Sequence, residues 1–216
     1  MGKPRSPKGR SVLVAERLAQ SFPGDAKALC ELTHDNAFQL LAATILSAQT
    51  TDVRVNEVTP ALFARYPTPE ALSRAAPEEL EGIIHSTGFF RAKAKSLIAM
   101  ATRLVDAFDS RVPHSIEDLT SLAGVGRKTA NVVRSVALNE PGLPVDTHVL
   151  RLSRKLGLTA GEDPVKVESE LNSLVPAAQR GVFSLRLILH GRRICAAKKP
   201  LCGECTLADF CPSAGK

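Results

Sequence analysis

The sequence lacks the features of a membrane or secreted protein. Its 216 residues contain no apolar run approaching the ~18–20 residues that a membrane-spanning helix needs. The basic start, residues 1–10, is not followed by an apolar segment, so it does not have the form of a secretory signal and is expected to be a disordered basic tail. Without such a signal we expect a cytoplasmic protein, and a reducing cytosol disfavours disulfides.

Alternating strand patterns, internal repeats and low-complexity linkers are also scarce, whereas apolar residues recur at helical spacing. One such buried helix face is formed by Leu97, Ala101, Leu104, Val105 and Phe108. The sequence therefore predicts an all-α fold of about ten short helices. A loop with two prolines and a glycine, residues 139–144, is a plausible hinge or subdomain boundary.

Cysteine is sparse but unevenly placed. Four of the five cysteines, Cys195, Cys202, Cys205 and Cys211, lie within 17 residues at the spacing C-x6-C-x2-C-x5-C. Four soft thiolates so close together can saturate one metal centre, either a four-thiolate zinc site or a cubane iron–sulfur cluster. Cys30 stands apart and is expected to be a buried free thiol.

Positive charge exceeds negative charge by six, which permits a polyanionic partner without proving one. Arg192, Arg193, Lys198 and Lys199 surround the first cysteine of the group. A solvated surface explains such a cluster as well as an anion-binding surface does.

A tight glycine turn lies between two predicted helices, residues 115–122 and 129–138. Gly124 and Gly126 can adopt positive φ and leave backbone N–H groups open to an anion. The second helix adds the positive end of its dipole. This arrangement suits a nucleic-acid phosphate and reads no base sequence, although an ordinary glycine cap explains the short pattern equally well.

Lys128 lies at the start of the second of these helices. A phosphate-binding or solvated lysine is the simpler interpretation. The helix dipole and the neighbouring Arg127 both disfavour a protonated ammonium here, as a nucleophilic amine requires. Burial in a pocket would have to supply most of that effect.

Asp146, in the segment Val145-Asp146-Thr147-His148, is placed to cap the helix that follows. A capping carboxylate is held rigidly, so it could also stabilise positive charge developing on a sugar carbon. His148 is either a proton relay or a helix-surface or core histidine.

Together these segments resemble the endonuclease III family of DNA base-excision glycosylases. The resemblance is carried in order by L-S-A-Q-T-T-D (residues 46–52), L-x-G-V-G-x-K-T-A (122–130), V-D-T-H (145–148), L-I-L-H-G (187–191) and the four-cysteine loop. It implies two helical lobes with a DNA-binding cleft between them. One lobe is a six-helix barrel with a helix-hairpin-helix, residues 31–139; the other joins residues 1–30 to 140–216 and carries a [4Fe-4S] cluster on the four cysteines.

The resemblance implies a monomer that removes oxidised pyrimidines from duplex DNA and cleaves the abasic site. The damaged nucleotide flips out of the duplex. Lys128 then attacks the sugar C1′ while Asp146 assists, and β-elimination from the Schiff base breaks the strand. The cluster holds its loop in shape and does no redox chemistry in catalysis.

Further DNA contacts are implied by position. Gln49 would enter the gap left by the flipped base, and Phe89 would wedge between bases of the opposite strand, although Phe90 is the alternative wedge and either could pack in the core. The remaining predicted contacts are Gly124, Gly126, Arg127, His148, Arg192, Lys198 and Lys199.

The sequence departs from the family pattern at Ala123, where proline is usual, and at the Phe89-Phe90 pair, so the preferred lesion stays open. A pyrimidine-dimer glycosylase would share Lys128 and the cluster. An adenine-mismatch glycosylase is expected to lack the lysine and to carry an extra C-terminal domain. A non-catalytic, zinc-bound damage-binding module would not need both Lys128 and Asp146.

Overall fold

The fold is all-α, as the helical periodicity predicts. The computed structural model describes residues 4–215, and no strand occurs among them. Contacts divide the chain into two compact units: unit 1, Met1–Leu29 with Glu140–Lys216, and unit 2, Cys30–Asn139. The expected disordered tail is only partly covered: residues 1–3 lie outside the described residues, whereas residues 7–10 already belong to the first helix.

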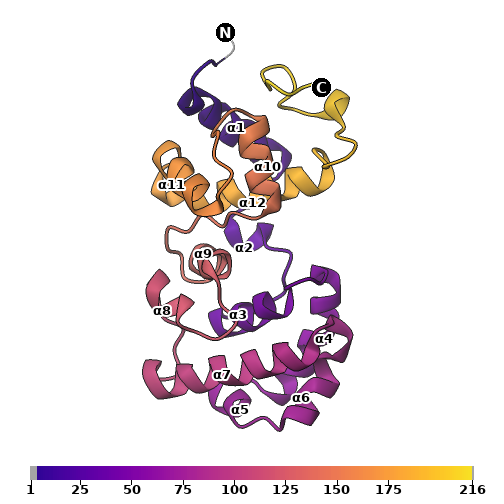
Figure 1. Ribbon diagram of the computed structural model, residues 1–216, viewed down its shortest axis with the longest axis vertical. Helices are drawn as coiled ribbons and strands as arrows, with labels where there is room; N and C mark the ends of the chain where they lie inside the picture. Colours follow the sequence, from indigo (N-terminus) through magenta and orange to yellow (C-terminus); the bar gives the residue numbers. More distant parts are fainter. Residues whose placement is uncertain (1–3, 216) are drawn as a thin grey trace. The chain divides into compact units, whose positions relative to one another are not determined.

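Unit 2 is built around one long helix (Figure 1). Its elements are α3 Ala37–Leu46, α4 Asp52–Arg65, α5 Pro69–Ser73, α6 Pro77–Ile84, the short 3-10 helix η1 His85–Thr87, α7 Phe90–Phe108, α8 Ile116–Thr120 and α9 Arg127–Val136. The predicted apolar stripe of α7 is buried at Leu97, Ala101 and Leu104. Helices α3, α5 and α6 all pack against α7, so burial of this stripe organises the unit.

Unit 1 is centred on the last α-helix. Its elements are α1 Pro7–Ser21, α2 Ala26–Leu29, α10 Thr147–Lys155, α11 Pro164–Leu174, η2 Ala177–Gln179, α12 Arg180–Arg193 and η3 Cys202–Glu204. Helix α12 buries residues on several sides, among them Phe183 and Leu187, and packs against α1, α2 and α10. A helix buried on most of its sides is expected at the centre of a bundle.

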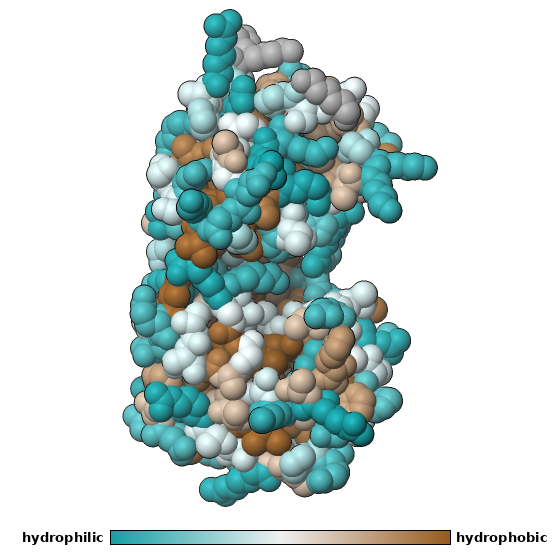
Figure 2. All heavy atoms as spheres, in the orientation of Figure 1, coloured by the Kyte–Doolittle hydropathy of each residue, from teal (hydrophilic) through white to brown (hydrophobic). Residues whose placement is uncertain are grey.

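Among residues 4–215, no helix is long and apolar enough to cross a bilayer. On the face drawn in Figure 2, hydrophilic side chains predominate and apolar side chains occur in small groups. Such scattered apolar exposure is ordinary for a folded protein in water.

Candidate functional site

The glycine turn between α8 and α9 has the predicted tight geometry at only one of its two glycines. Gly124 adopts φ +77°, and a Cβ there would come within 3.0 Å of Ser96 Cβ and 3.4 Å of Ile45 Cγ2. Only glycine satisfies both the conformation and the close packing. The expectation of positive φ at Gly126 is wrong: its φ is −92°, extended backbone that lets it precede the helix.

Gly126 leaves the start of α9 approachable. It offers no side chain to cap the helix, and a Cβ built on it would meet nothing within 4 Å. The first amides of a helix have no intrahelical acceptor and carry the positive end of the dipole. The exposed start of α9 therefore offers backbone N–H groups and a positive dipole end, which favour an anion.

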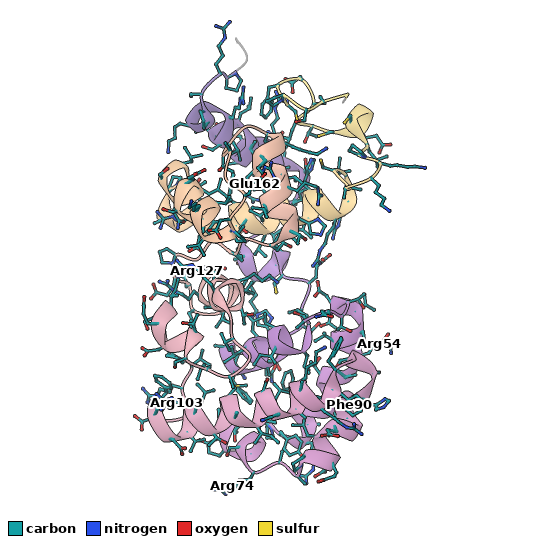
Figure 3. All side chains as sticks on the ribbon, in the orientation of Figure 1. Arg54, Arg74, Phe90, Arg103, Arg127 and Glu162 are labelled. Atoms are coloured by element: carbon teal, nitrogen blue, oxygen red, sulfur yellow. The ribbon has the colours of Figure 1, made fainter. Side chains whose placement is uncertain are left out.

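Arg127 and Lys128 form the first turn of α9, and both are exposed; Figure 3 labels Arg127 at this position. A neutral amine at Lys128 is favoured mainly if the side chain is buried. The side chain is instead open to solvent in the first turn of α9, although Asn131 and Val132, one turn further along, are buried. Any burial of the amine has to come from a bound ligand.

Asp146 caps α10 as predicted. Its Oδ1 accepts a hydrogen bond from the backbone N–H of Val149 at 2.8 Å, and the side chain is half-buried. The second carboxylate oxygen is not used in this bond. A rigidly held carboxylate with a spare acceptor suits either a purely structural cap or a charge-stabilising role.

His148 packs against α12 at a glycine. A Cβ at Gly191 would lie 2.8 Å from both Cβ and Nδ1 of His148, so only glycine permits this approach of α10 to α12. Arg151 lies one turn further along α10 and donates to the carbonyls of Gly191, at 3.2 Å, and Cys195, at 2.5 Å. One side of His148 thus packs against α12, and Arg151 links α10 to the backbone at the first cysteine of the loop.

Gln49 and Phe89 share an unusual backbone conformation. Both are non-glycine residues in the left-handed region, with φ 55° and 49°, and both are exposed, Phe89 to 67%. Phe90, by contrast, is half-buried with its ring 4.4 Å from that of His85. Because Phe89 is exposed and Phe90 packs against His85, the geometry favours Phe89 as the phenylalanine that contacts a bound partner.

The four cysteines of the C-terminal loop line one cavity. Their neighbours there include Leu152, Leu156, His190 and Ile194, together with Lys155 from the end of α10. Burial raises the pKa of the Cys195 and Cys205 thiols, and the other cysteine sulfurs add to that effect. Among residues 4–215 no His, Cys, Asp or Glu side chains are grouped closely enough for a single metal ion. Four thiols that line one cavity with mostly apolar neighbours are a soft donor set, which fits an iron–sulfur cluster.

His190, from the L-I-L-H-G segment, contacts the cysteine loop with both its side chain and its backbone. It is 3% exposed, its Nε2 lies 3.4 Å from Cys205 Sγ, and burial lowers its pKa to about 4. The imidazole is therefore neutral at pH 7. The backbone N–H of Cys195 also donates to the His190 carbonyl at 2.8 Å, so one residue holds the loop at two of its cysteines.

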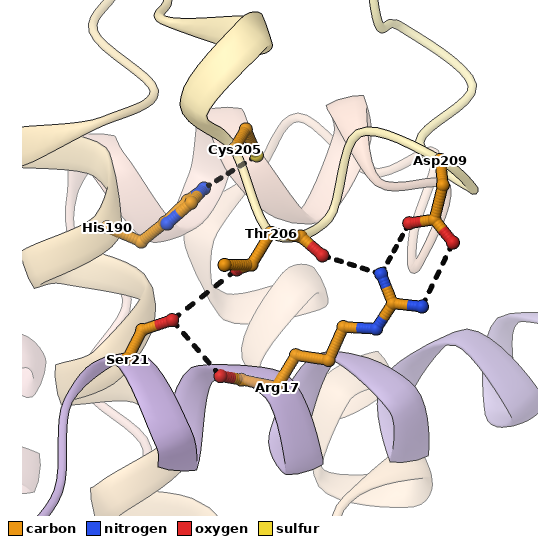
Figure 4. A network of polar contacts seen from close by, with 6 residues as sticks. All are labelled: Arg17, Ser21, His190, Cys205, Thr206 and Asp209. Carbon is orange, nitrogen blue, oxygen red and sulfur yellow. Dashed lines mark hydrogen bonds and ion pairs between the residues drawn. The ribbon is translucent and has the colours of Figure 1, made fainter.

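Arg17 of α1 closes the same loop from another side, as Figure 4 shows. It forms a two-pronged ion pair with Asp209, donates to the Thr206 carbonyl at 2.6 Å and stacks over Phe210. Neither Arg17 nor Arg151 was singled out by the sequence argument. Their only sequence signal is an arginine on a predicted helix, which is too common to identify a partner.

The basic residues near the cysteines are exposed, as expected. Arg192, Lys198 and Lys199 all lie at the surface of unit 1, and Arg193 stacks over Phe22. The predicted site residues thus fall into two groups. Unit 1 contains Asp146, His148, Arg192, Lys198, Lys199 and the four cysteines, and unit 2 contains Gln49, Phe89, Gly124, Gly126, Arg127 and Lys128.

Known proteins resemble this chain over nearly its whole length. A family model described as "HhH-GPD superfamily base excision DNA repair protein" matches residues 42–177. Endonuclease III of Synechocystis is 51% identical over 98% of this chain and 96% of its own, and that of Bacillus subtilis is 43% identical over 91% and 89%.

Solved structures agree with these matches. A non-covalent endonuclease III–DNA complex superposes with a TM-score of 0.89 at 39% identity, covering 96% of both chains. A trapped endonuclease III–DNA covalent intermediate superposes with a TM-score of 0.88 at 41% identity, again over 96% of both chains. A thermostable thymine-DNA glycosylase, 23% identical with a TM-score of 0.84, shares the fold.

Proposed function

Since the chain belongs to the endonuclease III family of base excision repair DNA glycosylases with abasic-site lyase activity, we propose that it excises oxidised pyrimidines from duplex DNA and cleaves the abasic site through Lys128. The observation that carries this proposal is the exposed amine of Lys128 in the first turn of α9, at the open end of the glycine turn. The pyrimidine-dimer enzyme and the non-catalytic module are not favoured by these matches.

The proposed chemistry begins when the damaged nucleotide leaves the base stack. The neutral amine of Lys128 forms a bond to C1′ as the glycosidic bond breaks and the base departs. Asp146 stabilises the positive charge that develops on the sugar. Opening of the sugar ring yields an imine, loss of a C2′ proton expels the 3′ phosphate, and water finally releases Lys128. Bound DNA supplies the burial that the amine lacks in the free protein.

The DNA contacts follow from exposure and charge. The amides at Gly124 and Gly126 and the side chain of Arg127 bind phosphate at the positive end of α9. Gln49 and Phe89 enter the base stack, where exposed side chains can replace a flipped base and unstack its partner. His148, Arg192, Lys198 and Lys199 extend the contact surface on unit 1. We propose that the protein acts on DNA as a monomer in the cytoplasm.

We further propose that Cys195, Cys202, Cys205 and Cys211 bind a [4Fe-4S] cluster. Support comes from the shared cavity, the all-thiol donor set and the apolar lining. When bound, the cluster supplies a rigid cross-link within the loop. The chain's own residues do the rest: Arg17, Arg151 and His190 hold the loop backbone, and the loop presents Lys198 and Lys199 to phosphate.

Borohydride trapping tests the proposed chemistry. Duplexes containing thymine glycol, an abasic site or no lesion are incubated with the wild type, Lys128→Gln and Lys166→Gln. The last variant removes another exposed lysine, from α11. We expect covalent products on both damaged duplexes with the wild type and Lys166→Gln, and none with Lys128→Gln. Trapping by Lys128→Gln would contradict the assigned nucleophile, and trapping confined to abasic DNA would contradict the proposed lesion class.

A further inference from the structure

Lys93 is a buried cation that the proposed chemistry does not use. It lies in the first turn of α7 and is 5% exposed. Its ammonium donates a hydrogen bond to the carbonyl oxygen of Thr87 at 2.8 Å. Burial lowers the pKa of this lysine. Burying an ammonium is unfavourable, so a side chain that only filled space here would be better apolar.

The Thr87 carbonyl is a shared acceptor that joins two segments of unit 2. It also accepts a hydrogen bond from Thr50 Oγ1 at 2.9 Å, although Thr50 is 37 residues away in the chain. Thr87 itself is fully buried, and its hydroxyl donates to the Ile84 carbonyl at 2.8 Å. Lys93 therefore donates to a fixed point that also anchors the segment preceding α4.

An exposed residue in the left-handed conformation lies close to each of the two joined positions, Thr50 and Thr87. Gln49 immediately precedes Thr50 and has φ 55°, and Phe89 lies two residues after Thr87 and has φ 49°. The backbone N–H of Lys93 also donates to the Phe89 carbonyl at 3.0 Å. Non-glycine residues hold this conformation only where surrounding contacts impose it. The Lys93 side chain supplies such a contact at Thr87, whereas its backbone bond to Phe89 is the ordinary first hydrogen bond of α7.

We propose that Lys93 is a positioning residue that couples Gln49 to Phe89 through the Thr87 carbonyl, so that both enter the base stack in one fixed geometry. The inference rests on the proposed function, because it takes these two side chains as the ones inserted into DNA. Lys93 touches neither the substrate nor the reacting atoms. Its loss therefore slows extrusion of a paired base and spares steps that need no extrusion.

The test compares two substrates under single-turnover conditions. Lys93→Met keeps an unbranched side chain one atom shorter and removes the donor, and Lys95→Met makes the same change at an exposed site on the same helix. On paired thymine glycol we expect Lys93→Met to excise on the order of tenfold more slowly, whereas cleavage of a preformed abasic site changes less than about twofold. Fluorescence of 2-aminopurine beside the lesion should rise less than with the wild type, and the melting temperature should not fall.

Thr50→Val provides a second variant, because it removes the other donor to the same carbonyl. We expect the same selective loss, and less than the summed loss when both changes are combined. The inference would be overturned if both variants excised the base at the wild-type rate, or if both lost equal rate on the two substrates. If the wild-type protein cleaved abasic DNA but excised no base, both the proposed lesion class and this inference would be wrong. If the wild type excised the base and the variants were unaffected, only this inference would be wrong.

Discussion

At the scale of single residues, two helical glycines give opposite predictions for the same substitution. A Cβ at Gly191 in α12 would lie 2.8 Å from His148 Cβ, whereas a Cβ at Gly82 in α6 would meet nothing within 4 Å. We expect Gly191→Ala to lower the free energy of unfolding by ~1–3 kcal/mol through overpacking. Gly82→Ala should raise it by ~0.5–1 kcal/mol, because alanine is the better helix former. Denaturant titration measures both; equal stability of the two variants would refute the packing argument.

The sequence could not identify the reason for Gly191, because it does not say which helix crosses at that point. Lys93 is different. It lies four residues before Leu97, on the predicted apolar face of α7, and a charged residue at a core position was a readable signal. Its partner was not readable, because the Thr87 carbonyl comes from a neighbouring turn whose path only the folded chain defines.

At the scale of the helix, Asp146 combines an observed cap of α10 with the proposed charge-stabilising role. Asparagine caps a helix as well as aspartate does but carries no charge. We therefore expect Asp146→Asn to unfold at the wild-type denaturant concentration while base excision slows on the order of a hundredfold, through loss of charge stabilisation. Asp163→Asn makes the same change at the cap of α11 and should leave excision unchanged. Full excision activity of Asp146→Asn would leave Asp146 with the capping role alone. A loss of stability that accounts for the slower excision would contradict the separate charge-stabilising role.

Helix positions followed from the sequence better than helix ends did. The predicted helix of residues 115–122 is shorter, Ile116–Thr120, because the chain closes a tight turn in which the N–H of Val125 bonds to the carbonyl of Leu122. The next helix starts two residues earlier than predicted, at Arg127, because Gly126 is extended and serves as its cap. The periodic apolar pattern locates a helix, but local hydrogen bonding decides where it ends.

At the scale of the whole chain, the polypeptide passes between its two units at two places. One passage, at Asn139–Glu140, coincides with the proline-containing loop, whereas the other, at Leu29–Cys30, has no proline or glycine nearby to indicate it. The cysteines divide in the same way: the group of four lies in unit 1 and Cys30 in unit 2. This division makes the consequences of losing the proposed cluster local and measurable.

We expect Cys202→Ala to lose bound iron and sulfide, because thiolate–metal bonding contributes directly to the stability of the folded loop. Amide hydrogen exchange should then quicken in residues 195–211 and at the end of α10, where Cys211 contacts the Lys155 carbonyl, while residues 30–139 keep wild-type protection. Cys30→Ala removes a thiol that burial holds at a raised pKa in unit 2, and it should keep full iron content. Full iron retained by Cys202→Ala would contradict Cys202 as a ligand. One zinc ion in place of iron and sulfide in the wild type would exclude the cluster and leave a four-thiolate zinc site.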